Sequence, residues 1–343
     1  MIDRGVELHN VEELIPCDGL SEFAMSRVPD AVRLKLNPAA QKTALNGSGV
    51  EIRFNLAGDS ACLTLRRAPD EGIPSVGIGE VWYGDFPAPY GETPVLIHDN
   101  PTTITITKPG NLERLIEIAN ENNLPFHPSL VRIRLPYDYQ NRLWSIEGDV
   151  TPPLPSQVPT RRFLAYGSSI THGGDAVRPS GSYIMRTAQH LDGDVINLGF
   201  AGSAHLEPEM ADYIAARGDW EFATLELGIN VIGSWSVEQF AEKVDYFVTR
   251  IARTNPDKWV FCTDIFTCSM DFVKDPKVEE FRRVVRTQVE RLNLSKLRYI
   301  SGQQLLTSAG GLTADLVHPS AAGAEQIALN LSDFIRKHLT IPT

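Results

Sequence analysis

The chain has 343 residues, 42% of them hydrophobic and 22% charged, which is the balance of an ordinary globular protein with room for two domains. Its formal net charge is -11. Such a surface repels phosphate backbones and anionic membranes, so we expect neither a nucleic acid nor a membrane as partner. The N-terminus has no basic segment followed by an apolar run, which favours a cytoplasmic protein without a secretory leader.

The first 150 residues are predicted to form mainly strands. β-branched and aromatic residues alternate or cluster in short segments, separated by Gly, Pro, Asn and Asp. These segments are 31–36, 50–58, 61–67, 75–84, 102–108, 129–136 and 143–150. Only residues 111–123 have the pattern of a helix. Seven short strands favour a β-sandwich of the jelly-roll kind.

A proline-rich segment, 151–160, is the best candidate for a linker, because proline stiffens the chain and cannot donate to a sheet. After it, strands alternate with helices. The expected strands are 163–167, 194–199, 222–228, 258–266 and 297–301, and the expected helices are 181–191, 205–218, 236–254, 278–292 and 322–339. This alternation predicts a parallel sheet covered on both faces, whose ligands bind at the carboxyl ends of the strands.

The four cysteines are too few for a disulfide scaffold. Cys262 and Cys268 could be zinc ligands, but no CxxC motif accompanies them, and buried thiols are the favoured interpretation.

A serine pair follows the first strand of the second half, in the turn Gly167-Ser168-Ser169. A serine in such a strand-to-helix turn points its hydroxyl out of the sheet, and the free N–H groups of the helix start favour an anion. Ser169 is therefore a candidate nucleophile. The alternative is that both serines only cap a helix.

Two further strands end in candidate hydrogen-bond donors. The strand at 194–199 leads into Gly202, where backbone can approach a ligand closely because glycine carries no Cβ. The strand at 222–228 leads into Asn230, whose side-chain amide could donate to an oxyanion. Each of them alone could equally be an ordinary turn residue.

Near the C-terminus, Asp315 and His318 stand three residues apart, before the last predicted helix. At this spacing the carboxylate can accept from the imidazole Nδ1–H, which leaves Nε2 free to take a proton from a serine. A surface turn is the alternative interpretation.

Taken together, these pieces resemble the blocks of the SGNH hydrolases, also called the GDSL family, over roughly residues 161–338. The resemblance implies that Ser169 is the nucleophile, His318 the base and Asp315 the residue that holds the base. It also implies that the N–H groups of Ser169 and Gly202 and the amide of Asn230 form the oxyanion hole. Two positions depart from the family pattern, since Ser168 and Val231 stand where the family often has aspartates that help to orient the site.

The resemblance implies a three-layer, flavodoxin-like α/β domain at 161–343, after a β-sandwich accessory domain at 1–150 and a linker at 151–160. It implies a serine esterase that needs no cofactor and no metal. The branch with this first block and an N-terminal sandwich is associated with acetylated sugars. We therefore expect short acyl esters, acetyl above all, on a small molecule or an oligosaccharide.

Further residues are candidates for substrate contacts. They are His172, His205, Trp82 and Tyr83, with Phe86 and Tyr90 near the last two. Local hydrogen bonding of the histidines and core packing of the aromatic rings are the alternatives. A metal site made by the two histidines with Asp175 is disfavoured.

Two other functions stay open. One is an acyltransferase that uses the same site with an alcohol in place of water, and the other is a noncatalytic carbohydrate-binding protein on a hydrolase scaffold. The sequence leaves the oligomeric state open, a homo-oligomer included. The α/β-hydrolase fold is disfavoured because the chain has no GxSxG motif.

Overall fold

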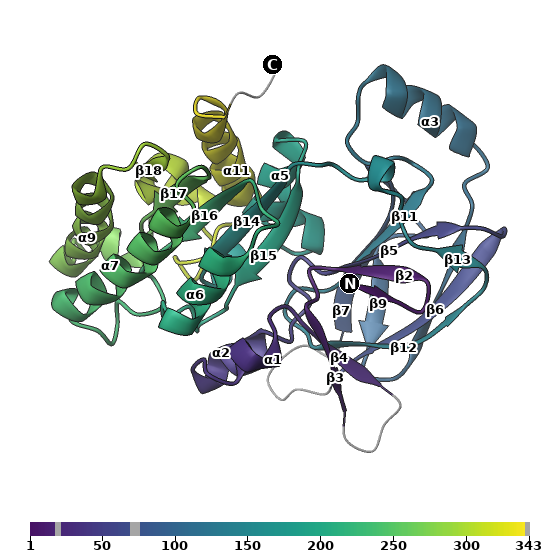
Figure 1. Ribbon diagram of the computed structural model, residues 1–343, viewed down its shortest axis with the longest axis horizontal. Coiled ribbons are helices and arrows are strands. Elements are labelled where there is room, and N and C mark those ends of the chain that lie inside the picture. Colours follow the sequence, from purple (N-terminus) through teal and green to yellow (C-terminus); the bar gives the residue numbers. More distant parts are fainter. Residues whose placement is uncertain (18–21, 69–75, 340–343) are drawn as a thin grey trace.

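The computed structural model describes residues 1–17, 22–68 and 76–339. Within these residues, two antiparallel sheets come first along the chain and a parallel sheet flanked by helices follows (Figure 1). The two arrangements lie beside each other in space, with the antiparallel strands on one side and the α/β part on the other.

The antiparallel strands form two sheets around one core. The larger sheet has the order β1 (Ile2–Asp3), β2 (Val6–His9), β5 (Glu51–Leu56), β11 (Leu130–Arg134), β7 (Val76–Tyr83) and β8 (Phe86–Pro87), with β13 (Val150–Thr151) on β5 and β9 (Val95–His98) on β7. The other has the order β10 (Thr102–Thr107), β6 (Ser60–Arg67), β12 (Asn141–Glu147), β4 (Phe23–Ser26) and β3 (Glu13–Pro16).

Alternation of buried side chains explains why these sheets face each other. In β6, Ala61, Leu63 and Leu65 are buried while the residues between them are partly exposed. Successive side chains of a strand point to opposite faces, so one face of β6 is apolar and must be covered. Its buried residues join Ile52 and Ile133 of the larger sheet in one hydrophobic cluster. The predicted β-sandwich is thereby confirmed, whereas its jelly-roll connectivity stays a prediction.

Two predictions for the first half are wrong. The segment 31–36 is not a strand, because α1 (Asp30–Arg33) and a following turn occupy it. The helix α2 (Pro38–Thr43) comes next, and the Asn37 side chain caps it by accepting from Ala40 N–H at 3.0 Å. The predicted helix at 111–123 is present as α3 (Leu112–Glu121), but it is not the only helix. Ser75, where the predicted strand 75–84 begins, lies outside the described residues.

The parallel sheet has the strand order β15 (Asp194–Gly199), β14 (Arg162–Gly167), β16 (Phe222–Glu226), β17 (Trp259–Thr263) and β18 (Leu297–Ile300). One face packs against α6 (Pro208–Ala216), α7 (Val237–Thr254) and α9 (Pro276–Leu292), and the other against α5 (Tyr183–His190) and α11 (Ala321–Arg336) (Figure 1). Short helices lie in the connections, namely α4 (Ser169–His172), α8 (Ser269–Phe272), α10 (Gly302–Leu305) and the 3-10 turns Pro155–Gln157, Pro179–Gly181 and Ala309–Gly311.

Burial of β14 on both faces produces the three layers. Phe163 and Ala165 belong to the cluster under α5 and α11, while Leu164 and Tyr166 belong to the cluster under α6 and α7. Continuous burial is typical of a parallel strand covered by helices on both sides. The strand order is that of flavodoxin-like folds, in which ligands bind outside the carboxyl ends of the strands where the order reverses, here beside β14. The predicted fold class is confirmed.

Buried polar contacts connect the sandwich to the parallel sheet. Two N–H groups of the Arg53 guanidinium donate to the two Asp194 carboxylate oxygens at 2.7 and 2.8 Å. Further along the same strand, Asn10 Nδ2 and Arg27 Nη1 both donate to the backbone carbonyl of Asn197, at 3.0 and 2.9 Å. The sandwich therefore holds β15 directly, and β15 leads into one of the loops at the candidate site.

The proline-rich segment packs closely against the sandwich. Thr151 still pairs with Asn55 in the larger sheet. Gln157 donates to Asn55 Oδ1 at 2.7 Å and to Ser129 Oγ at 2.8 Å. The boundaries that we predicted for two domains and a linker stay predictions.

Within the described residues, we find no helix whose length and apolar character would let it cross a membrane. Cys262 and Cys268 are both buried. Burial raises the pKa of the Cys262 thiol.

Candidate active site

Ser169 begins a short helix directly after β14. Gly167 is required at the end of the strand, because a Cβ there would lie 2.3 Å from Thr171 Oγ1 and 2.5 Å from Glu226 Oε2. The backbone N–H of Ser168 donates to Glu226 Oε2 at 2.6 Å, and the Ser168 hydroxyl caps α4 by accepting from Ile170 N–H at 3.1 Å. The Ser168 side chain is thus engaged in capping, and the turn presents the Ser169 hydroxyl at the carboxyl edge of the sheet.

His318 lies against this hydroxyl. His318 Nε2 and Ser169 Oγ are 2.7 Å apart, within hydrogen-bond distance. On the other side of the ring, His318 Nδ1 is 2.5 Å from Asp315 Oδ2. The three side chains therefore form one continuous hydrogen-bonded chain, with His318 between the serine and the carboxylate.

A tight turn holds Asp315 in place. Its Oδ1 accepts from Thr313 Oγ1 and from the backbone N–H groups of Val317 and His318, at 2.7, 2.8 and 3.0 Å. Partial burial acts to raise the pKa of Asp315, but the hydrogen bonds from His318, Thr313 and the backbone outweigh it and hold the pKa well below its usual range. The Asp315 side chain is therefore ionised in the folded protein at neutral pH.

The two remaining predicted residues lie on the loops that follow β15 and β16. Gly202 has φ +63°, and a Cβ at this position would meet no atom within 4 Å. Asn230 is half-buried, and its side-chain oxygen accepts from the backbone N–H of Ala204 at 3.1 Å. Because the oxygen is engaged, the Nδ2 amide group is the end left to donate elsewhere.

His172, one of the candidate substrate contacts, is buried with both ring nitrogens hydrogen-bonded. It is 1% exposed, with Nδ1 2.8 Å from the carbonyl of Gly199 and Nε2 2.9 Å from the carbonyl of Tyr137. Burial, and then the charge of Arg27, lowers the pKa of His172 to about 3. It joins α4 to β15 and to the sandwich. These are contacts of the kind that the alternative interpretation, local hydrogen bonding, describes, and a contact of His172 with substrate stays a prediction.

The other candidate substrate contacts have different surroundings. His205 is half-buried, 5.9 Å from the Trp235 ring. The Trp82 ring is buried, and the guanidinium carbon of Arg134 lies over it, 4.0 Å from the ring centroid. The buried Tyr83 donates its hydroxyl proton to the carbonyl of Thr107 at 2.9 Å. Both rings are buried and have contacts within the sandwich, and their contact with substrate stays a prediction.

Two carboxylates near His318 were not predicted. Asp175 Oδ2 is 3.2 Å from His318 Nδ1, on the same ring nitrogen that faces Asp315. Asp138, from the loop between β11 and β12, is 3.5 Å from His172 Nε2, and burial followed by the charge of Asp175 raises its pKa to about 6. The sequence pattern indicates Asp175 only as a disfavoured metal ligand beside His172, and nothing in the pattern around Asp138 points to the site.

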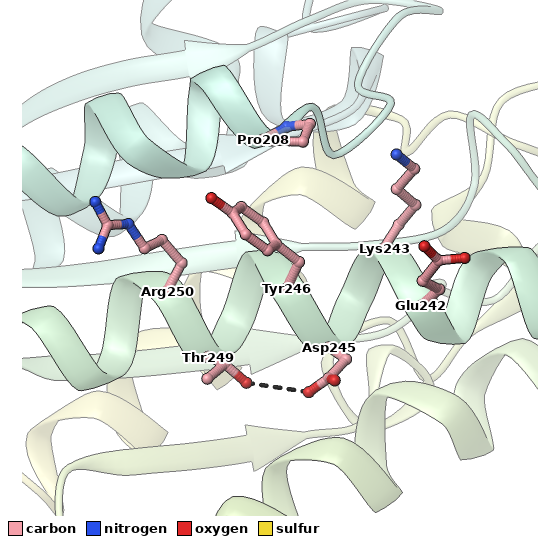
Figure 2. A pocket seen from close by; sticks show the side chains of 7 residues that line it. All are labelled: Pro208, Glu242, Lys243, Asp245, Tyr246, Thr249 and Arg250. Atoms are coloured by element: carbon pink, nitrogen blue, oxygen red, sulfur yellow. Dashed lines mark hydrogen bonds between the residues drawn. The ribbon is translucent and has the colours of Figure 1, made fainter.

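A large surface pocket of about 470 Å³ lies away from these residues (Figure 2). Figure 2 shows it between the start of α6 and one face of α7, where Asp245 and Thr249 are hydrogen-bonded. Its lining residues are Pro208, Glu242, Lys243, Asp245, Tyr246, Thr249 and Arg250. None of its lining residues belongs to the serine, histidine and aspartate chain.

Comparison with protein families matches residues 160–336, more than half of the chain, to the GDSL-like lipase/acylhydrolase family. The chain belongs to this family. It is accordingly a carboxylic ester hydrolase by class, as the sequence predicted. Comparison with curated protein sequences finds no relative that matches.

Solved structures of similar architecture span nearly the whole chain. The salicylyl-acyltransferase SsfX3 from a tetracycline biosynthetic pathway is 18% identical, with a TM-score of 0.79 over 99% of this chain and 97% of its own. A family two carbohydrate esterase from Cellvibrio japonicus is 14% identical, with a TM-score of 0.63 over 98% and 95%. Another from Clostridium thermocellum, in complex with cellohexaose, is 15% identical, with a TM-score of 0.61 over 86% and 94%. These likenesses confirm the fold, sandwich included.

Proposed function

We propose that the protein is a serine esterase that cleaves short acyl esters through an acyl-enzyme on Ser169. The observation that carries this proposal is the hydrogen-bonded chain from Ser169 Oγ through His318 to Asp315. A nucleophile within reach of a base, and a base oriented by a third group, is the arrangement that covalent acyl transfer requires. A noncatalytic protein has no need to keep these three side chains hydrogen-bonded to one another in this order.

The first half of the reaction forms the acyl-enzyme. His318 Nε2 takes the hydroxyl proton of Ser169 as the serine oxygen attacks the ester carbonyl. The N–H groups of Ser169 and Gly202 and the amide of Asn230 stabilise the resulting oxyanion. The intermediate collapses, and His318 gives its proton to the departing alcohol.

The second half releases the acid. His318 takes a proton from a water molecule as that water attacks the acyl carbonyl, and the same donors hold the second oxyanion. Collapse of this intermediate returns the proton to Ser169 Oγ. Asp315 stays ionised and stabilises the imidazolium that forms twice in each cycle.

We propose acetyl as the preferred acyl group and a carbohydrate or similar polyol as the alcohol. Two of the similar structures are carbohydrate esterases, which supports this choice by analogy of fold. The test is turnover of acetylated sugars beside p-nitrophenyl esters of increasing chain length. We expect kcat/KM to fall as the acyl chain lengthens. A preference for long acyl chains, with no release of acetate from any sugar, would contradict the proposal.

An acyltransferase is the second candidate, since an architecture like that of SsfX3 spans almost the whole chain. The same acyl-enzyme would then be discharged by an alcohol in place of water. Product analysis with an added acceptor alcohol separates the two functions. Free acid as the main product supports the esterase, and a new ester in excess supports the transferase.

We also propose that residues 1–150 serve as an accessory unit, joined through 151–160 to the catalytic unit at 161–343. The contacts of Asn10 and Arg27 with the Asn197 carbonyl support a role for the sandwich in holding β15. Asn197 in turn donates to the carbonyl of Thr171 at 2.9 Å and accepts from Gly199 N–H at 2.8 Å. The accessory unit would then stabilise the loop that carries the Gly202 donor.

A further inference from the structure

His318 faces two carboxylates through one nitrogen. Asp315 Oδ2 lies 2.5 Å and Asp175 Oδ2 lies 3.2 Å from His318 Nδ1. Asp315 comes from the turn just before His318, whereas Asp175 comes from the loop that follows the helix of Ser169. The two carboxylates that face His318 Nδ1 therefore come from two separate segments of the chain, one next to the histidine and one next to the nucleophile.

The loop that carries Asp175 has an unusual backbone conformation. Its backbone has positive φ at Gly173, Asp175 and Val177, with values of 119°, 59° and 62°. Such values are uncommon for residues other than glycine, and for the β-branched Val177, whose side chain is exposed, they are a marked exception. Ala176 N–H donates to the carbonyl of Gly173 at 3.1 Å, which closes the turn that carries Asp175.

Contacts at the preceding glycine show how close the loop lies to the reacting groups. Gly174 N–H donates to the carbonyl of Ser169 at 2.8 Å. A Cβ on Gly174 would lie 3.0 Å from His318 Cδ2, closer than side chains normally approach. The loop therefore packs directly on the serine and histidine pair, and it brings the Asp175 carboxylate to the side of the ring that is away from Ser169.

We propose that Asp175 is a positioning residue for the esterase reaction, a second carboxylate that helps to orient His318 and stabilises its protonated form. This inference rests on the proposed function, because it assigns a role beside the same base. Each time His318 takes a proton, the imidazolium has two carboxylates within 3.2 Å. When Asp315 is removed, Asp175 remains to accept from Nδ1–H and to keep Nε2 directed at Ser169.

A double-mutant cycle tests the proposal. Both aspartates face His318 Nδ1, so alanine replaces each of them, because asparagine would offer an N–H to Nδ1 and favour the wrong tautomer. Alone, Asp175→Ala should lower kcat by about 2–5-fold, since an exposed charge is partly screened by solvent. In the Asp315→Ala background it should lower kcat by a further factor of about 10–50, with KM changed much less.

Asp257→Ala is the matched control. Asp257 is exposed and precedes β17, so it lies at the amino edge of the sheet, opposite the site, and its replacement changes the net charge equally. It should leave kcat unchanged in both backgrounds. If Asp175→Ala had the same effect with and without Asp315, or no more effect than Asp257→Ala, the proposal would be overturned.

The pH profile gives a readout that a merely structural role would not move. Removal of the Asp175 charge makes the His318 imidazolium less stable, so the acid limb of the kcat/KM profile should move to lower pH. This displacement should be smaller at high salt, because salt screens the charge. Three other carboxyl groups also interact with His318, namely Asp315, Asp138 and Glu226. Because burial and the charge of Asp175 raise the pKa of Asp138 to about 6, profiles are compared between Asp138→Asn and the Asp138→Asn/Asp175→Ala double variant. An unmoved limb would contradict the proposal.

Two controls distinguish the positioning role from a metal site and from failure of the esterase mechanism. The atoms of Asp175, Asp315 and His318 lie within 4.8 Å of one another and could hold a cation, so wild-type activity is measured with and without EDTA and the variants are assayed in its presence. Activity abolished by EDTA would overturn the proposal in favour of a metal role. Wild-type turnover in Ser169→Ala would defeat the proposed function itself. An inactive Ser169→Ala enzyme together with additive aspartate effects would overturn only the role of Asp175.

Discussion

The side-chain oxygen of Asn230 accepts a 3.1 Å hydrogen bond from the backbone N–H of Ala204. This contact joins the loop after β16 to the loop after β15, which also carries Gly202. It fixes which end of the Asn230 amide is engaged and which is left to donate. The next residue, Val231, is fully buried in the hydrophobic cluster under α6 and α7, so the core occupies the position where the family often has an aspartate.

The first prediction concerns this amide. Charge develops on the substrate oxygen only as Ser169 attacks, so a donor placed there acts mainly on the transition state. Asn230→Ala should lower kcat by about 10²–10³, or roughly 3–4 kcal/mol, and leave KM nearly unchanged. Asn230→Asp should be at least as damaging, because a carboxylate repels the oxyanion. Near-wild-type kcat in both folded variants would show that Asn230 is an ordinary turn residue.

The second prediction separates the two adjacent serines. Ser169→Ala should lower kcat by roughly 10³–10⁶, the range seen when a triad nucleophile is lost. Ser168→Ala removes the hydroxyl that caps α4, so it should lower the free energy of unfolding by about 1 kcal/mol and affect kcat far less. Steady-state kinetics and denaturant unfolding of both variants check this. Reversed kinetic effects would mean that Ser168 is the nucleophile.

The third prediction concerns stability at acid pH. Burial acts to raise the pKa of Asp194, but the charge of Arg53, then that of His9, and the hydrogen bonds from Arg53 outweigh it and leave the pKa well below its usual range. A depressed pKa stabilises the folded state above the unfolded-state pKa of about 3.9, and this contribution is lost as pH falls below that value.

Asp194→Asn should therefore destabilise the protein at neutral pH by about 3 kcal/mol, the cost of breaking a buried pair. The difference between variant and wild type should shrink as pH falls from about 5 towards 2. Denaturant unfolding at a series of pH values measures it. A difference that stays constant over this range would show that the carboxylate charge is not the cause.

The α/β half could be predicted because its signals are local. Runs such as 163–167 and 194–199 are apolar, short and bounded by glycine, which is what a strand buried on both faces requires. Asp315 and His318 are close in sequence, so their contact could be inferred from spacing alone. Ser169 and His318 are far apart in sequence, and only the order of the strands brings them to one edge of the sheet.

Other features depend on contacts that no local pattern records. The segment 31–36 has alternating apolar residues that resemble a strand, and six residues are too few to separate this from a helical turn. Asp175 lies close to His318 in a loop with positive φ at Gly173 and at Asp175 itself, and the sequence pattern does not reveal these conformations. His172 follows the nucleophile on a one-turn helix, where sequence alone does not tell which side of the turn faces the core.

The measurement that most directly tests the central claim is identification of the acylated residue. The enzyme is mixed briefly with p-nitrophenyl acetate, quenched with acid and analysed by intact-protein and peptide mass spectrometry. We predict a mass increase of one acetyl group on the peptide that contains Ser169, and its loss in Ser169→Ala. Acetylation at another side chain, or undiminished hydrolysis by Ser169→Ala, would contradict a serine esterase that works through Ser169.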